Sequence, residues 1–216
     1  MAIELSLGLD FRNKRFKDAA VGLRAYAKAL QVDWDSLAPV LSKELRSFLD
    51  SVAEALAKRH GVAWPSGTSG QSLSKRSGGL VDSIIKSVTV EGTTFETIEG
   101  HIGAAYPYGI HEFGGVITAK SAKYLTIPLP AALDNRGVPL RKNAREWEHT
   151  FVATSKAGNL IIFQRRGAAI VPLYVLKSSV PIRPRLGMGK TLDAGLPYFR
   201  ERAMDQMVQK LIEGSR

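Results

Sequence analysis

Apolar residues recur three or four positions apart in three parts of the chain, and this spacing predicts helices. The longest apolar stripe falls on residues 35–60, where Asp35 or Ser36 is expected to cap the helix. Residues 18–32 are rich in Ala, Leu, Arg and Lys, which favour helix. Residues 197–213 repeat apolar positions every four residues after a proline in the first turn. The pattern therefore places helices near both ends of the chain.

Between these helical parts the pattern changes to the shorter period of β-strands. A hairpin is expected over residues 86–102, with its turn at Gly92 and Thr93. Prolines fall at or beyond the ends of the later strands, which should therefore be short or lie at sheet edges. These strands are expected at residues 116–118, 124–129, 150–154, 160–164 and 173–180. Together, the predicted helices and strands indicate an α+β protein with N-terminal helices, a mostly antiparallel sheet and a C-terminal helix packed on it.

A segment rich in Gly and Ser, residues 63–79, separates the two patterns. It has too few apolar residues to form a core, so it is predicted to be a long flexible loop. We expect one α+β domain over residues 1–216. Its parts are a helical N-terminal part at 1–62, this loop, and a sheet core with the C-terminal helix at 80–216.

The chain has 216 residues, of which 44% are hydrophobic and 23% charged, as in ordinary globular proteins. Its net charge is +10, and the excess is not evenly spread. Residues 116–191 carry thirteen basic and three acidic side chains, whereas the remainder of the chain is balanced at seventeen of each. A concentrated excess of this kind indicates an anionic partner, either nucleic acid or an acidic protein surface. A basic surface that serves only solubility is the alternative.

Candidate chemistry is sparse. The chain has no cysteine, which excludes disulfides and thiol catalysis, and its four histidines are too scattered to suggest a zinc site. The sequence has no run of eighteen apolar residues and no signal-peptide pattern at its start. We therefore expect no metal, no cofactor and no membrane segment, and a protein that folds in a cytoplasm.

Two fragments resemble enzyme motifs but each lacks a required residue, and a third motif is absent. Gly187-Met-Gly-Lys-Thr191 ends like a phosphate-binding P-loop, but Pro184 stands where that loop needs its first glycine. His111-Glu112 lacks the second histidine of a zinc-protease helix, and no G-x-S-x-G element occurs. No sequence-reading nucleic-acid motif is visible either. The chain is therefore expected to have no catalytic residues and not to be an enzyme.

Three consecutive elements carry a resemblance. Arg76-Ser-Gly-Gly-Leu-Val-Asp-Ser-Ile84 precedes the predicted hairpin, Tyr108-Gly-Ile-His-Glu-Phe-Gly-Gly115 follows it, and Lys123-Tyr-Leu-Thr-Ile-Pro-Leu129 comes next. In order and spacing they resemble the tail-completion or neck proteins of tailed bacteriophages. This family includes the Mu-type virion morphogenesis proteins and is similar to the minor tail protein Z of lambda-like phages. The resemblance covers about residues 64–129 and, more loosely, the closing helix, but says least about residues 130–185.

The motif residues are expected to maintain the fold or to contact a neighbouring subunit. Glu112 is expected to pair with a cation such as Arg76, inside one subunit or across two, and Phe113 to fill apolar space beneath the hairpin. The residues concerned are Arg76, Gly79, Leu80, Tyr108, His111, Glu112, Phe113, Gly114 and Gly115.

The resemblance implies a structural protein of the virion, located at the neck and assembled in the host cytoplasm. It would form a ring with copies of itself, most simply a hexamer. This ring would join the head connector or adaptor protein to the tail terminator or tail tube protein, with possible contact to DNA in the lumen. An alternative remains open: a basic nucleic-acid-associated protein that binds phosphate without sequence preference.

Eight basic residues of the segment 116–191 are the expected surface for an acidic partner ring or for passing DNA. They are Lys120, Lys123, Arg136, Arg141, Lys142, Arg145, Arg165 and Arg166. If they contact phosphate, binding should depend on salt and not on base sequence.

Overall fold

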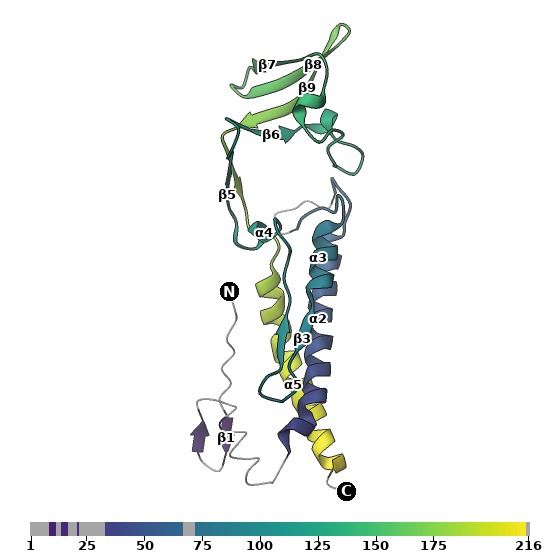
Figure 1. Ribbon diagram of the computed structural model, residues 1–216, viewed down its shortest axis with the longest axis vertical. Coiled ribbons are helices and arrows are strands. Elements are labelled where there is room, and N and C mark those ends of the chain that lie inside the picture. Colours follow the sequence, from purple (N-terminus) through teal and green to yellow (C-terminus); the bar gives the residue numbers. More distant parts are fainter. Residues whose placement is uncertain (1–8, 12–13, 17–20, 22–32, 67–71, 215–216) are drawn as a thin grey trace. The chain divides into compact units, whose positions relative to one another are not determined.

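The computed structural model describes residues 9–11, 14–16, 21, 33–66 and 72–214 (Figure 1). It confirms the α+β class, with long helices and antiparallel strands. The contacts within the chain divide it into two compact units. Unit 1 takes its described residues from Met1–Phe48, Thr89–Gly100 and Leu196–Arg216, and unit 2 comprises Leu49–Val88 and His101–Gly195. Neither unit coincides with the expected parts 1–62 and 80–216.

The predicted helix at 35–60 is present and slightly longer. A 3₁₀ turn, η1 (Trp34–Leu37), leads directly into α2 (Ala38–His60). The cap is Asp33 and not Asp35 or Ser36, because the added turn moves the start of the helix toward the N-terminus. The Asp33 carboxylate accepts a hydrogen bond of 3.1 Å from the Asp35 N–H. The helix predicted at 18–32 lies outside the described residues, apart from Val21.

Unit 1 is held together by contacts between the first part of α2 and the later part of α5 (Met188–Gly214). Phe48 stacks on Phe199 with ring centroids 5.1 Å apart. The buried Glu44 carboxylate accepts a bond of 2.7 Å from the Arg202 guanidinium. Helix α5 begins nine residues before the predicted 197, so Pro197 lies inside the helix and not at its start. A proline there donates no N–H to the preceding turn.

Unit 1 also contains short strands. β1 (Leu9–Phe11) pairs with β2 (Lys14–Phe16), and β3 (Thr89–Glu91) pairs with β4 (Glu99–His101), the latter ending at the unit boundary. The second pair is the predicted hairpin of 86–102 in shortened form. Its first residues belong instead to α3 (Gly79–Ser87) in unit 2.

Unit 2 contains a four-stranded antiparallel sheet in the order β6 (Leu125–Pro128), β9 (Ala169–Lys177), β8 (Leu160–Arg166) and β7 (Thr150–Thr154). Two 3₁₀ turns, η2 (Pro130–Ala132) and η3 (Ala144–Glu146), lie between β6 and β7 in the chain. The pairing of β8 with β9 shifts so that Leu173 is an extra residue beside Pro172. A bulge of this kind accommodates a proline within a central strand. Leu173 is fully buried and, with Ala132 and Tyr174, forms the core of this sheet.

The predicted strand 173–180 is in fact two strands with different partners. β9 ends at Lys177, and β10 (Ser179–Ile182) pairs antiparallel with β5 (Gly115–Thr118). We call this two-stranded element the ribbon (Figure 1). All four residues of β5 are exposed.

The described ends of the predicted loop 63–79 are anchored within unit 2. The Trp64 N–H donates to the Lys75 carbonyl and the Lys75 N–H donates to the Val62 carbonyl, over 3.2 and 2.8 Å. The Arg76 guanidinium donates to the Gly137 carbonyl over 3.0 Å and lies above the Trp64 ring. Backbone and side-chain bonds thus hold these described ends of the segment, which its shortage of apolar residues did not indicate; its flexibility stays a prediction. Residues 67–71 lie outside the described part.

Candidate functional site

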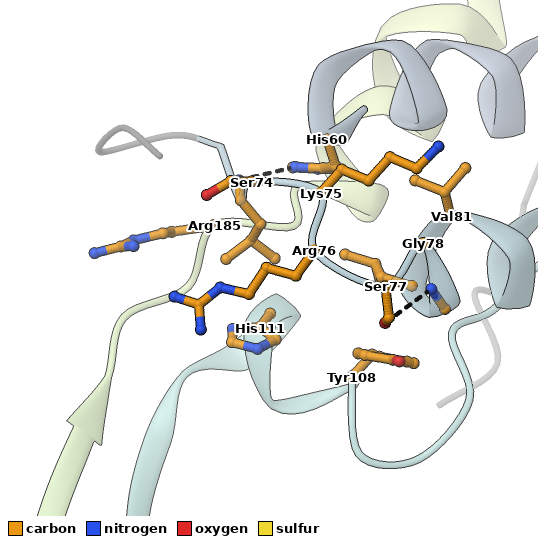
Figure 2. A pocket seen from close by; sticks show the side chains of 13 residues that line it. His60, Ser74, Lys75, Arg76, Ser77, Gly78, Val81, Tyr108, His111 and Arg185 are labelled. Atoms are coloured by element: carbon orange, nitrogen blue, oxygen red, sulfur yellow. Dashed lines mark hydrogen bonds between the residues drawn. The ribbon is translucent and has the colours of Figure 1, made fainter. Parts of the chain in front are cut away.

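Two of the three elements that carry the sequence resemblance, those beginning at Arg76 and Tyr108, meet at one pocket in unit 2 (Figure 2). Five of the nine motif residues line it: Arg76, Gly79, Leu80, Tyr108 and His111. The first three come from the loop before α3 and from its first turn, and the other two from the turn into α4 (Ile110–Phe113). The pocket is open to solvent and has a volume of about 340 Å³. Sequence spacing thus identified groups that the fold brings together.

Gly79 and Tyr108 fit closely. A Cβ atom on Gly79 would lie 2.5 Å from the Tyr108 hydroxyl oxygen, well inside contact distance. The preceding residue, Gly78, has φ of 89°, a left-handed conformation that glycine adopts without strain. These glycines allow the tyrosine to reach the start of α3.

His60 joins three segments at the back of the pocket and is only 1% exposed. Its Nδ1 accepts the Leu73 N–H over 3.1 Å, and its Nε2 lies 3.0 Å from the Leu186 carbonyl. These partners assign the neutral tautomer with the proton on Nε2, which donates to that carbonyl. Burial lowers the pKa of His60 below its ordinary value of 6.5, in keeping with a neutral ring. The residue therefore holds the end of α2 against both neighbouring segments.

The backbone carbonyl of His111 binds the segment that contains Arg185 and Leu186. This carbonyl accepts the N–H groups of Arg185 and Leu186, over 2.7 and 2.8 Å. The His111 ring, in contrast to the carbonyl, is unpaired at Nδ1, which is buried and has no hydrogen-bond partner among the described residues. The Arg185 Nε is also buried and has no partner among them. Burial lowers the pKa of His111, and the charge of Arg185 lowers it further. Two residues that line the pocket therefore each have a buried polar atom whose hydrogen-bonding capacity is unused within the described chain.

Glu112 caps the start of α5 from another element. Its two carboxylate oxygens accept the N–H groups of Met188 and Gly189, over 2.8 and 3.0 Å. The expected pairing with Arg76 is therefore wrong within one subunit, because that guanidinium is held by Gly137 and Trp64; pairing across two subunits stays a prediction. The first N–H groups of a helix have no partner within it, and a carboxylate satisfies them and suits the helix dipole.

Phe113 does not fill space beneath the hairpin: it is 76% exposed, and that prediction is wrong. Successive helical residues point about 100° apart. With Glu112 directed at α5, the next side chain points elsewhere, in this case to solvent. Gly114, with φ of 73°, and Gly115, with φ of 153°, then turn the chain into β5. A Cβ atom on Gly114 would lie 3.0 Å from the Ile182 carbonyl oxygen, so the turn also needs its small size.

All eight basic residues predicted as a partner surface are exposed. The structure brings two of them together, since the guanidinium groups of Arg141 and Arg166 lie 5.9 and 6.0 Å from the centre of the Trp147 ring. Arg165 lies 6.0 Å from the Phe151 ring, whereas Arg136 bonds to Asp134. The other four lie in the segments between β5 and β7: Lys120, Lys123, Lys142 and Arg145.

Sequence reasoning missed five polar residues of the pocket: His60, Ser74, Lys75, Ser77 and Arg185. Lys75 and Ser77 flank Arg76, so the motif itself could have pointed to them. His60 and Arg185 lie far away in the sequence, and no local signal marks them. Over the part of the chain that the structure describes, no cluster of three or more His, Asp or Glu side chains could hold a metal, and no helix could span a membrane.

Comparison of the chain with protein-family models, with curated proteins and with solved structures finds no match.

Proposed function

We propose that the chain is a non-enzymatic structural protein of a tailed-phage virion, a tail-completion or neck component. A ring of its copies, six in the simplest case, would join the head connector to the tail. The order and spacing of the motifs suggest this role. The observation that supports it best is the ribbon, whose apolar side chains face solvent.

The ribbon has exposed apolar side chains and unpaired strand edges among the described residues. Val116 and Ile117 of β5 are 61% and 40% exposed, and Phe113 precedes them in the chain. Each strand of the ribbon pairs only with the other among the described residues, so both outer edges are free. An isolated two-stranded sheet is marginally stable in water, and a free apolar edge is a template for pairing with another chain. A ring subunit needs such a surface, because closed rings form when each subunit offers two different faces.

The motif residues support an architectural role. Glu112 caps α5, Gly79 makes room for Tyr108, and Gly114 turns the chain into the ribbon. Each of these residues stabilises the local fold, and none of these roles requires a substrate.

The test is to change the ribbon within the phage that encodes the chain. In Val116→Lys with Ile117→Lys, heads and tails should both assemble but remain unjoined, because a charged edge resists pairing. The matched control is Val152→Lys with Ile170→Lys, since both residues are 54% exposed and lie on strands of the other sheet. Circular dichroism checks that both variants fold. Normal joining by a folded ribbon variant would contradict the proposal.

A second candidate is non-specific binding of nucleic-acid phosphate, favoured by Arg141 and Arg166 beside Trp147. Exposed guanidinium groups beside an aromatic ring suit phosphate contact and base stacking. Gel shifts with a duplex should then weaken by about 0.9 log unit per log unit of salt for each contact, for any sequence. Absence of duplex binding at low salt would exclude this candidate.

A further inference from the structure

The pocket between the elements that begin at Arg76 and Tyr108 is lined by several basic side chains. Besides His111, three cations line it, namely Lys75, Arg76 and Arg185, and no acidic side chain of the described residues does. We propose that this pocket binds an oxyanion of the phosphate type. The inference goes beyond the proposed function and does not depend on it.

Two of the three cations have no carboxylate partner, since Arg76 and Arg185 form no salt bridge among the described residues. Lys75 does lie near a carboxylate, because a Cβ on Gly78 would be 3.4 Å from the Lys75 Cε and 3.8 Å from the Asp82 Oδ2. The Glu112 carboxylate is engaged by the N–H groups of Met188 and Gly189. Like charges gathered around a partly enclosed space repel one another, and a bound anion relieves this repulsion. In Figure 2 the Arg76 and Arg185 side chains both extend to the left of the view, whereas the Lys75 side chain extends to the right.

The unused polar atoms have the chemistry that an oxyanion satisfies. The Arg185 Nε always carries a proton and is always a donor, yet it is buried without an acceptor among the described residues. The His111 Nδ1, buried in the same way, becomes a donor when protonated. An unpaired buried donor is costly, and a tetrahedral oxyanion offers several acceptors at once. The guanidinium fork is also the group that best matches phosphate geometry.

The first turn of α3 supplies further donors. The Gly79 N–H already donates to the Ser77 Oγ over 3.4 Å, and the next two residues of the first turn, Leu80 and Val81, line the pocket. The Lys75 side chain lies beside this turn, since a Cβ on Gly78 would be 3.4 Å from its Cε. The start of a helix carries partial positive charge and exposed N–H groups, which add to the attraction of the cations.

The pocket has room for more than a bare ion. Small-molecule pockets begin at about 300 Å³, and this one measures about 340 Å³. The shared chemistry is thus a phosphate group, either free or carried by a small organic molecule. Comparison of inorganic phosphate with glycerol phosphate distinguishes these two sources.

Calorimetric titration of the full chain at constant ionic strength tests the proposal. Inorganic phosphate should bind saturably at one site, whereas acetate and chloride should bind much more weakly. Arg185→Gln should weaken phosphate binding at least about tenfold, as expected for the loss of a charge-assisted hydrogen bond. The matched control is Arg183→Gln, an exposed arginine two residues away that does not line the pocket, and it should change affinity less than about twofold.

If Arg185→Gln does not fold, the exposed Lys75→Gln takes its place, with an expected weakening of about threefold or more. Tighter binding of glycerol phosphate than of inorganic phosphate would assign an organic phosphate, and equal binding the free ion. Failure of folded wild-type protein to bind either one would overturn the proposal. Equal losses in the pocket variant and in Arg183→Gln would overturn it as well, since they would show general charge attraction.

Discussion

Glu112 fastens the start of α5, so its replacement by Ala should destabilise unit 2 measurably. Two N–H groups, those of Met188 and Gly189, would lose their acceptor. Loss of a single N-cap acceptor typically costs about 0.5–2 kcal/mol, and hydrogen bonds to charged groups contribute about 1.5–3 kcal/mol each. Because the site is only partly buried, we expect Glu112→Ala to lower the free energy of unfolding by about 2–3 kcal/mol. Glu112→Gln keeps one acceptor oxygen but no charge and should cost about half as much.

The assay for Glu112 combines urea unfolding with amide hydrogen exchange. Exchange should accelerate at Met188 and Gly189 more than elsewhere, which separates loss of the cap from general destabilisation. Glu148→Ala is the control, because Glu148 is an exposed glutamate of the same unit. The reasoning is refuted if Glu112→Ala costs less than about 0.5 kcal/mol, the range of ordinary surface changes, and leaves exchange at both amides unaltered.

Three further predictions concern other parts of the chain. Gly79→Ala should destabilise the protein by about 1–3 kcal/mol through a clash with the Tyr108 hydroxyl, and Tyr108→Phe should relieve it in urea unfolding; additive losses would contradict this. Burial lowers the pKa of His60 from 6.5, so the unfolded chain takes up the proton first. The free energy of unfolding should therefore be highest above about pH 6.5 and fall as the pH drops toward the folded-state pKa; a flat profile between pH 7.5 and 5.5 would be the contrary result. Arg141→Glu with Lys142→Glu should leave the circular dichroism spectrum unchanged but stop head–tail joining, since both residues are exposed; normal infectious yield would favour a basic surface that serves solubility alone.

Much of the fold follows from local pattern. The apolar stripe predicted a helix ending at residue 60, and alternation predicted β7 (Thr150–Thr154) at its observed bounds. The start of α5 was missed because Pro197 is typical of a first helical turn, whereas a carboxylate from α4 stabilises an earlier start. The boundary between β9 and β10 was missed because strand alternation does not reveal that the chain changes partners.

The candidate site was predictable only in part. Motif spacing selected Arg76, Gly79 and Tyr108, which the fold gathers at one pocket. It gave no indication of Arg185, which reaches the pocket because its N–H bonds to the His111 carbonyl across a long stretch of sequence. The role of Phe113 was wrong because its direction depends on the helical phase that Glu112 sets. Contacts made over long sequence separations depend on tertiary packing, which a single sequence does not display.

Electron cryomicroscopy of the phage that encodes the chain tests the proposed role most directly. Particles carrying a small epitope at the exposed turn that contains Gly158 should show antibody label, or added density, in a ring between head and tail. The account predicts label at that junction, and free heads and free tails when the chain is absent. Joined, infectious particles that lack the chain, or label located away from the neck, would contradict it.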